Sequence, residues 1–117
     1  PTHESPENAR RMVERLLEEQ EDLVGLFVTG GGISGVLKAL RAADPATRGR
    51  MRVVGRDLGP ETRSGLTEGL ITAALCHPLE RISDELVDAM LAATRQKPGA
   101  PVLQRIVPMD IVVPASV

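Results

Sequence analysis

The chain has 117 residues, of which 42% are apolar, and a formal net charge of −2 at neutral pH. This length supports one compact domain with a single core. The near-neutral charge argues against a nucleic-acid-binding surface, because neutralising phosphates requires clustered Lys and Arg. No apolar run is long enough to span a bilayer and no signal-like segment opens the chain, so we expect a cytoplasmic protein without a membrane partner.

Cysteine and histidine are too sparse to build a metal centre. Cys76 is the only cysteine and cannot form an internal disulfide. His3 and His77 have no neighbouring thiols or carboxylates at metal-ligand spacing. We therefore expect no metal site and no bound cofactor.

The first predicted helix runs from Ser5 to Gln20. Ser5-Pro6 is typical of an N-cap followed by a first-turn proline, and apolar residues then recur at helical spacing. The chain continues directly into a short apolar run, Leu23–Val28, which predicts a strand covered on both faces.

A parallel βαβ unit follows from the next segments. Three glycines, Gly30 to Gly32, allow a tight turn, and helical spacing of apolar residues then predicts a helix that ends before Asp44-Pro45. Met51–Gly55 supplies the second strand, which requires a right-handed crossover. Arg56 and Asp57 then lie at the carboxyl end of that strand, where open α/β sheets bind ligands.

The same alternation continues to the tail. Pro60 begins a short helix that bears Leu66, and Leu70–Leu75 predicts a third strand. An amphipathic helix is expected from Pro78 to Arg95, and the tail Val102–Val113 carries two short β-prone runs. The predicted fold class is therefore α/β, with a parallel sheet flanked by helices.

Two features suggest that this domain is part of a larger structure. The first helix has no strand before it, and the tail is apolar and extended, as in a segment that joins a sheet or is covered by a partner. The alternative is a small complete domain whose last strand pairs on its own edge.

The order of the segments resembles a known family of regulators. The matching stretches are LVGLFVTGG, GVLKALRAA, VVGRD, GLITAALCHPLERISDELVDAML and PMDIVVP. Together they resemble the C-terminal lobe of the effector-binding domain in lac-repressor-type transcription regulators, a fold shared with type I periplasmic sugar-binding proteins. The resemblance covers nearly the whole chain, residues 1–117. Three positions depart from the family pattern: Arg56 replaces an aromatic residue, Thr29-Gly30 replaces Asn-Asp, and His77 stands where Gln is common.

The resemblance implies a binding site for a small effector, usually a sugar, between two lobes. Carried over, it nominates Thr29, Gly30, Arg56, Asp57 and His77 as ligand-binding residues. Carboxylate, guanidinium and imidazole groups suit sugar hydroxyls, which need both donors and acceptors. Each residue also has a plainer interpretation: the glycine forms the turn, Asp57 caps a turn, Arg56 is a solvated charge, and His77 caps the following helix.

The resemblance also implies a homodimer, with DNA bound only through a head domain absent from this chain. The predicted interface lies on the helix Ile33–Ala42 and the strand Leu70–Leu75. Its residues are Ile33, Val36, Leu37, Leu40, Leu70 and Thr72. A wide apolar stripe can serve both a core and a partner, but the alternative is that the sheet buries the helix residues completely.

Two other functions remain open. Within the same fold, the chain could belong to a periplasmic-type solute-binding protein of a transporter. Gly30-x-Gly32-x-x-Gly35, with Asp57 further on, also matches the dinucleotide fingerprint of an NAD(P)-binding Rossmann fragment. The chain has no Tyr for the catalytic pair of short-chain dehydrogenases. We expect no enzyme activity and no catalytic residues.

Overall fold

The computed structural model describes residues 3–117. The chain divides into two compact units, which are described separately: Pro1–Cys76 with Ile111–Val117, and His77–Asp110.

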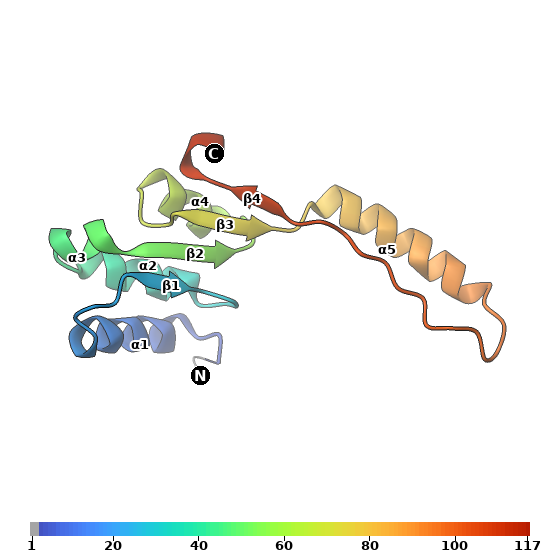
Figure 1. Cartoon of the computed structure of the whole chain (residues 1–117), viewed down its shortest axis with the longest axis horizontal. Helices are drawn as coiled ribbons and strands as arrows, with labels where there is room; N and C mark the ends of the chain where they lie inside the picture. Colours follow the sequence, from blue (N-terminus) through green and yellow to red (C-terminus); the bar gives the residue numbers. More distant parts are fainter. Residues whose placement is uncertain (1–2) are drawn as a thin grey trace. The chain divides into compact units, whose positions relative to one another are not determined.

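The first unit is an α/β layer built on a four-stranded sheet (Figure 1). The strands are β1 (Gly25–Phe27), β2 (Arg52–Arg56), β3 (Ala73–Cys76) and β4 (Asp110–Val112), adjacent in that order. β1, β2 and β3 are mutually parallel, with Phe27 opposite Val54 and Val54 opposite Ala73. The arrow of β4 points against that of β3 in Figure 1. The predicted fold class, α/β with a mostly parallel sheet and helices, is confirmed.

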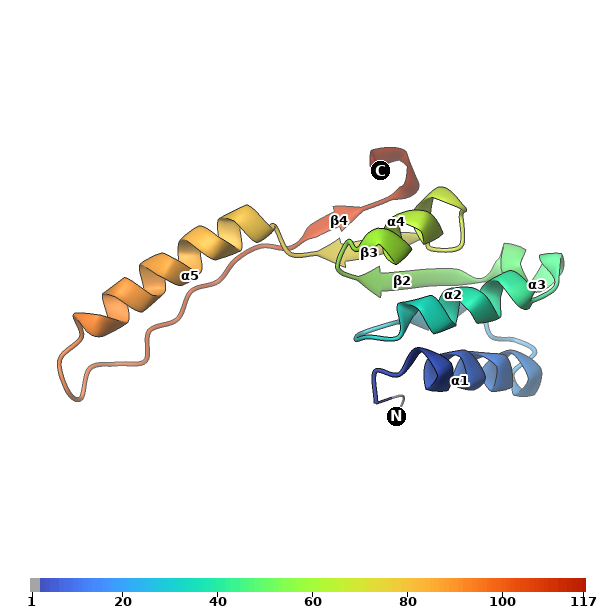
Figure 2. The same ribbon diagram turned by 180° about the vertical axis from the view of Figure 1, so that it is seen from behind.

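The helices of this unit are α1 (Pro6–Glu19), α2 (Ile33–Ala42), α3 (Pro45–Arg50) and α4 (Pro60–Thr67), and a 3₁₀ turn closes the chain at Pro114–Ser116. α2 and α4 lie on the same face of the sheet (Figure 2). Successive side chains along each strand point to opposite faces of the sheet. Val53, Ala74 and Cys76 are buried on the face that α2 and α4 cover. The largest fully buried residues are Leu37, Leu40, Leu66, Ile71 and Val53.

The helix α3 was not predicted, although the sequence carries its start signal. Asp44 is its N-cap: the carboxylate accepts the Thr47 backbone N–H at 2.9 Å, and Pro45 follows in the first turn. From the sequence, the Asp44-Pro45 pair predicts only the end of the preceding helix α2. The helix α3 contains Gly49 and has no buried residue. Its sequence therefore shows no periodic apolar pattern that would predict a helix.

The third strand begins three residues later than predicted. The N–H groups of Leu70 and Ile71 both donate to the carbonyl oxygen of Gly65, and Gly69 has a φ of 76°. These bonds close the C-terminus of α4 in the manner of a glycine-terminated helix. Leu70 and Ile71 therefore belong to the helix-ending turn, and the strand that pairs with β2 is Ala73–Cys76.

The close packing of α1 against α2 depends on Gly35. A Cβ atom at this position would overlap the carbonyl oxygen of Pro6 and lie 3.0 Å from the backbone nitrogen of Arg10. Both neighbours are backbone atoms of α1, so neither can move without moving the helix. Gly35 therefore lets two helix backbones approach, while Ala9 and Val13 of α1 enter the core.

An ion pair connects the surface ends of α2 and α4. The Arg41 guanidinium donates to both carboxylate oxygens of Glu68, at 2.7 and 2.8 Å, and the Ser64 hydroxyl donates to the same carboxylate at 2.7 Å. These bonds, first from Arg41 and then from Ser64, lower the pKa of Glu68 to about 2.

The second unit contains one long helix, α5 (Leu79–Thr94), followed by an extended return. None of its helical residues is buried, and apolar side chains remain exposed at Leu79, Leu86, Val87, Met90 and Leu91. Across the described residues 3–117, no helix is long and apolar enough to cross a membrane.

We expect Gly35→Ala to lower the free energy of unfolding by about 3 kcal/mol, because overpacking here forces α1 away from α2. The matched control is Gly49→Ala in α3, where a Cβ atom meets nothing within 4 Å. This control should raise stability by about 0.5–1 kcal/mol, since alanine favours the helix. Urea denaturation of both variants measures the difference; equal stabilities would contradict the packing role of Gly35.

We also expect Glu68→Gln to change the acid sensitivity of the fold. The pKa of Glu68 is lowered in the folded state, so its ionised form adds stability above the unfolded pKa of about 4.3, and this contribution is lost as pH falls toward 2. The melting temperature of the wild type should therefore exceed that of the variant at pH 7, with the gap closing below pH 4. In an Arg41→Met background the gap at pH 7 should shrink; a gap independent of pH and of Arg41 would refute the ion pair's contribution.

Candidate functional site

A polar hollow of about 410 Å³ lies at the carboxyl ends of β1 and β2. Four of the five residues predicted to bind ligand line it together. The lining residues are Glu4, Val28, Thr29, Gly30, Gly31, Ile33, Arg56, Asp57, Gly59, Glu61 and Thr62. Three carboxylates and one guanidinium are thus present around one space.

Parallel strands bring these residues to one edge. Thr29 and Gly30 follow β1, while Arg56 is the last residue of β2 and Asp57 comes next. Because β1 and β2 run in the same direction, with Phe27 opposite Val54, their ends meet at the same side of the sheet. This is the place where open α/β sheets bind ligands.

Asp57 has a left-handed backbone, with a φ of 62°. Its N–H donates to the carbonyl oxygen of Leu75 at 2.9 Å, which extends the ladder between β2 and β3 by one residue. Asp is among the few residues that tolerate this conformation, so the turn itself is one reason for an aspartate here. The conformation also directs the chain away from β2 toward Gly59 and the start of α4.

The glycine turn is occupied by the segment that precedes α1. The Glu4 carboxylate accepts the backbone N–H of Gly31 at 3.4 Å. A Cβ atom at Gly30 would lie 3.0 Å from that carboxylate, and at Gly32 2.9 Å from the Ala9 side chain. The three positions of the Gly30-x-Gly32-x-x-Gly35 pattern are thus each accounted for by close contact with the α1 segment.

His77 directly follows β3 but belongs to the second unit. The residues that line the hollow do not include it. Its assignment to the site stays a prediction.

The residues predicted for a dimer interface fall into two groups. Val36, Leu37 and Leu40 are buried in the core of a single copy, whereas Ile33 and Leu70 are half-buried and Thr72 is exposed. The Thr72 side-chain oxygen accepts the N–H of Val53 at 3.1 Å, which ties the start of β3 to β2. The α2 stripe thus serves the core at three of its four positions, and the interface stays a prediction.

Three lining residues were not found from the sequence: Glu4, Glu61 and Thr62. Glu61 and Thr62 lie in the first turn of α4, which starts four residues after β2 ends. This short connection is a sequence signal that could have placed both residues at the same edge of the sheet. Glu4 comes from a segment far away in sequence, and only the packing of α1 brings it to the hollow. No sequence signal indicates that contact.

The arrangement can both accept hydrogen bonds from hydroxyl groups and donate hydrogen bonds to them. Asp57 and Glu61 carry acceptor oxygens, and Arg56 carries donors. Within residues 3–117, no cluster of three or more His, Cys, Asp or Glu side chains could hold a metal ion.

Several solved structures have the same fold over nearly the whole chain. A glucose-galactose binding protein from Geobacillus stearothermophilus has a TM-score of 0.76 at 19% identity, covering 97% of this chain and 40% of that one. An ABC transporter solute binding protein from Agrobacterium vitis with bound D-fucose has a TM-score of 0.75 at 18% identity, covering 96% and 38%. An arabinose binding protein from Geobacillus stearothermophilus has a TM-score of 0.74 at 15% identity, covering 96% and 40%.

These likenesses show that the chain has the fold of a lobe of periplasmic binding proteins. The chain spans about two-fifths of the length of the structures that it matches. No protein-family model and no curated protein matches the sequence.

Proposed function

We propose that this chain is the sugar-binding lobe of a lac-repressor-type transcription regulator, acting in the cytoplasm as a sensor rather than as an enzyme. The observation that carries the proposal is the meeting of Thr29, Gly30, Arg56 and Asp57 around one hollow at the carboxyl ends of two parallel strands. The fold neighbours are binding proteins, and the names of several state a sugar.

The roles follow from the chemistry of sugar hydroxyls. Asp57 and Glu61 accept hydroxyl hydrogen bonds, and the Arg56 guanidinium donates to ring or hydroxyl oxygens. His77 is proposed to complete the site from the end of β3. A second lobe would close over the ligand and exclude water, which a single lobe cannot do.

A transport-type solute-binding protein is the second candidate. It is favoured by the same neighbours, one of which is named as a solute binding protein of an ABC transporter. The complete product of the encoding reading frame separates the two: a helix-turn-helix head and sequence-specific DNA binding that the sugar alters would support the regulator, and an export signal would support the transporter.

We expect Asp57→Asn to weaken sugar binding by the complete product about 10- to 100-fold, because the carboxylate is replaced by a neutral amide with a weaker acceptor. Calorimetry with a panel of D-glucose, D-galactose, D-fucose and L-arabinose measures it. The control is Asp22→Asn, an exposed carboxylate at the amino end of β1, which should leave affinity unchanged. The 117-residue chain alone should bind these sugars only weakly. In the complete product, equal sugar affinities of the wild type and both Asp variants would refute the assignment of Asp57 to the binding site.

The regulator proposal also includes a homodimer through the outer side of α2. Since Val36 is buried in the core, the test uses Lys38, which is exposed on the same helix. Lys38→Glu should shift the complete product toward monomer in sedimentation velocity without changing its melting temperature. The matched control is Lys97→Glu, beyond α5; a dimer that both substitutions leave intact would place the interface elsewhere.

A further inference from the structure

The glycine turn after β1 leads into the N-terminus of α2, which carries no negative charge of its own. Gly32 is the N-cap and has no side chain to cap the helix, and the first turn of α2 contains no acidic residue. The first N–H groups of a helix have no partner within the helix, and the helix dipole adds partial positive charge there. A glycine turn ahead of a helix therefore attracts phosphate groups and other anions.

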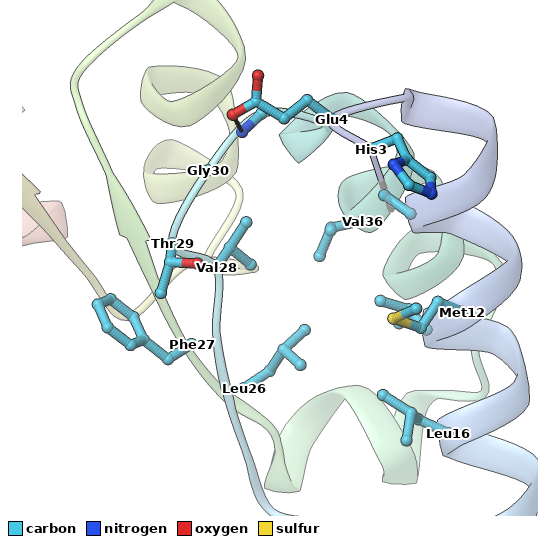
Figure 3. A pocket seen from close by; sticks show the side chains of 13 residues that line it. His3, Glu4, Met12, Leu16, Leu26, Phe27, Val28, Thr29, Gly30 and Val36 are labelled. Carbon is cyan, nitrogen blue, oxygen red and sulfur yellow. Dashed lines mark hydrogen bonds between the residues drawn. The ribbon is translucent and has the colours of Figure 1, made fainter. Parts of the chain in front are cut away.

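The Glu4 carboxylate lies at this turn. It accepts the Gly31 N–H at 3.4 Å, and Figure 3 draws this bond beside the hollow between β1 and α1. The glycines leave room for the Glu4 side chain, because a Cβ atom at Gly30 would lie 3.0 Å from Glu4 Oε1 and one at Gly31 would lie 3.0 Å from Glu4 Cβ. Glu4 thus lies directly on the turn, where a dinucleotide fingerprint places a pyrophosphate.

The backbone before α1 bends so that Glu4 reaches the turn. His3 and Glu4 both have left-handed backbones, with φ of 49° and 58°, a conformation that is unfavourable for residues with a Cβ atom. Ser5 then caps α1, and its side chain accepts the Asn8 N–H at 3.4 Å. The capped helix on one side and the glycine turn on the other hold Glu4 in place.

Glu4 also adds negative charge to the polar hollow at the strand ends. Three carboxylates line this hollow, those of Glu4, Asp57 and Glu61. The Arg56 guanidinium offsets one of these charges, so the lining keeps an excess of negative charge. An anionic group of a ligand would meet this repulsion as well as an occupied turn. A ligand without phosphate or carboxylate groups meets neither obstacle.

We propose that Glu4 is a specificity-determining residue of the candidate site: its carboxylate occupies the place where the glycine turn would otherwise hold a phosphate, so the site takes free sugars and excludes phosphorylated sugars and nucleotides. The choice of free sugars rests on the proposed function, which it narrows to unphosphorylated ligands. The exclusion of phosphate rests on the turn alone.

Titration of the 117-residue chain with inorganic phosphate, at constant ionic strength and followed by amide NMR, tests the occupied turn without any sugar. In Glu4→Ala the amide resonances of Gly31 and Gly32 should shift saturably, with an affinity for phosphate at least about tenfold above that of the wild type. The matched control is Glu19→Ala, which removes the same charge from the exposed end of α1 and should behave as the wild type. Equal phosphate responses of the wild type, Glu4→Ala and Glu19→Ala would overturn the proposal.

A second variant separates charge from space at the same position. Glu4→Gln keeps the size of the side chain and an acceptor for the Gly31 N–H but loses the charge, so its phosphate affinity should lie between those of the wild type and Glu4→Ala. Glu4 is exposed, and the melting temperatures of both variants should stay close to that of the wild type. A phosphate affinity of Glu4→Gln below that of the wild type would contradict the role of the Glu4 charge.

Calorimetry on the complete product, with D-glucose and D-galactose and with their phosphate esters, gives the readout on sugars. The wild type should bind a free sugar at least about tenfold more tightly than its phosphate ester, and Glu4→Ala should narrow this ratio. A phosphate ester that the wild type binds as tightly as the free sugar would overturn this inference and leave the proposed function intact. If neither form of any sugar binds, the proposed function fails, and the phosphate titration alone decides the role of Glu4.

Discussion

The contact between the backbones of α1 and α2 at Gly35 is the constraint on which the first unit depends. Because residue 35 has no side chain, the first turn of α1 lies directly on α2, and Ala9 and Val13 enter the core. The same contact brings Glu4 to the N–H of Gly31 at the end of β1. One close approach thus determines the core on one side and part of the candidate site on the other.

The candidate site lies at the carboxyl ends of two strands and is lined by charged side chains. Arg56 and Asp57 reach the hollow because β2 ends there, and Glu61 reaches it because α4 starts four residues later. Short connections and parallel strands therefore concentrate polar groups that are only modestly separated in the chain. The left-handed Asp57 links the two, since its conformation turns the chain from β2 toward α4.

Uncovered apolar surface is the other feature of this molecule. A hollow of about 430 Å³ between β1 and α1 is lined by apolar side chains such as Leu26 and Met12, and in the second unit Leu86, Val87 and Met90 of α5 are more than half exposed. Large exposed apolar surfaces are uncommon on monomeric proteins, because exposed apolar area is costly in water.

The sequence by itself determined the alternation of strands and helices, the parallel order of β1 and β2, and the polar residues at their ends, because periodicity and glycine or proline signals are local. It did not determine where β3 begins, since Leu70 and Ile71 are β-prone but their N–H groups bond to Gly65. It left open whether Val36 is buried within one copy or faces a partner, and it could not indicate that Glu4 joins the site. Those facts depend on which helix faces which, and contacts between segments distant in the chain are decided only when the tertiary structure brings them together.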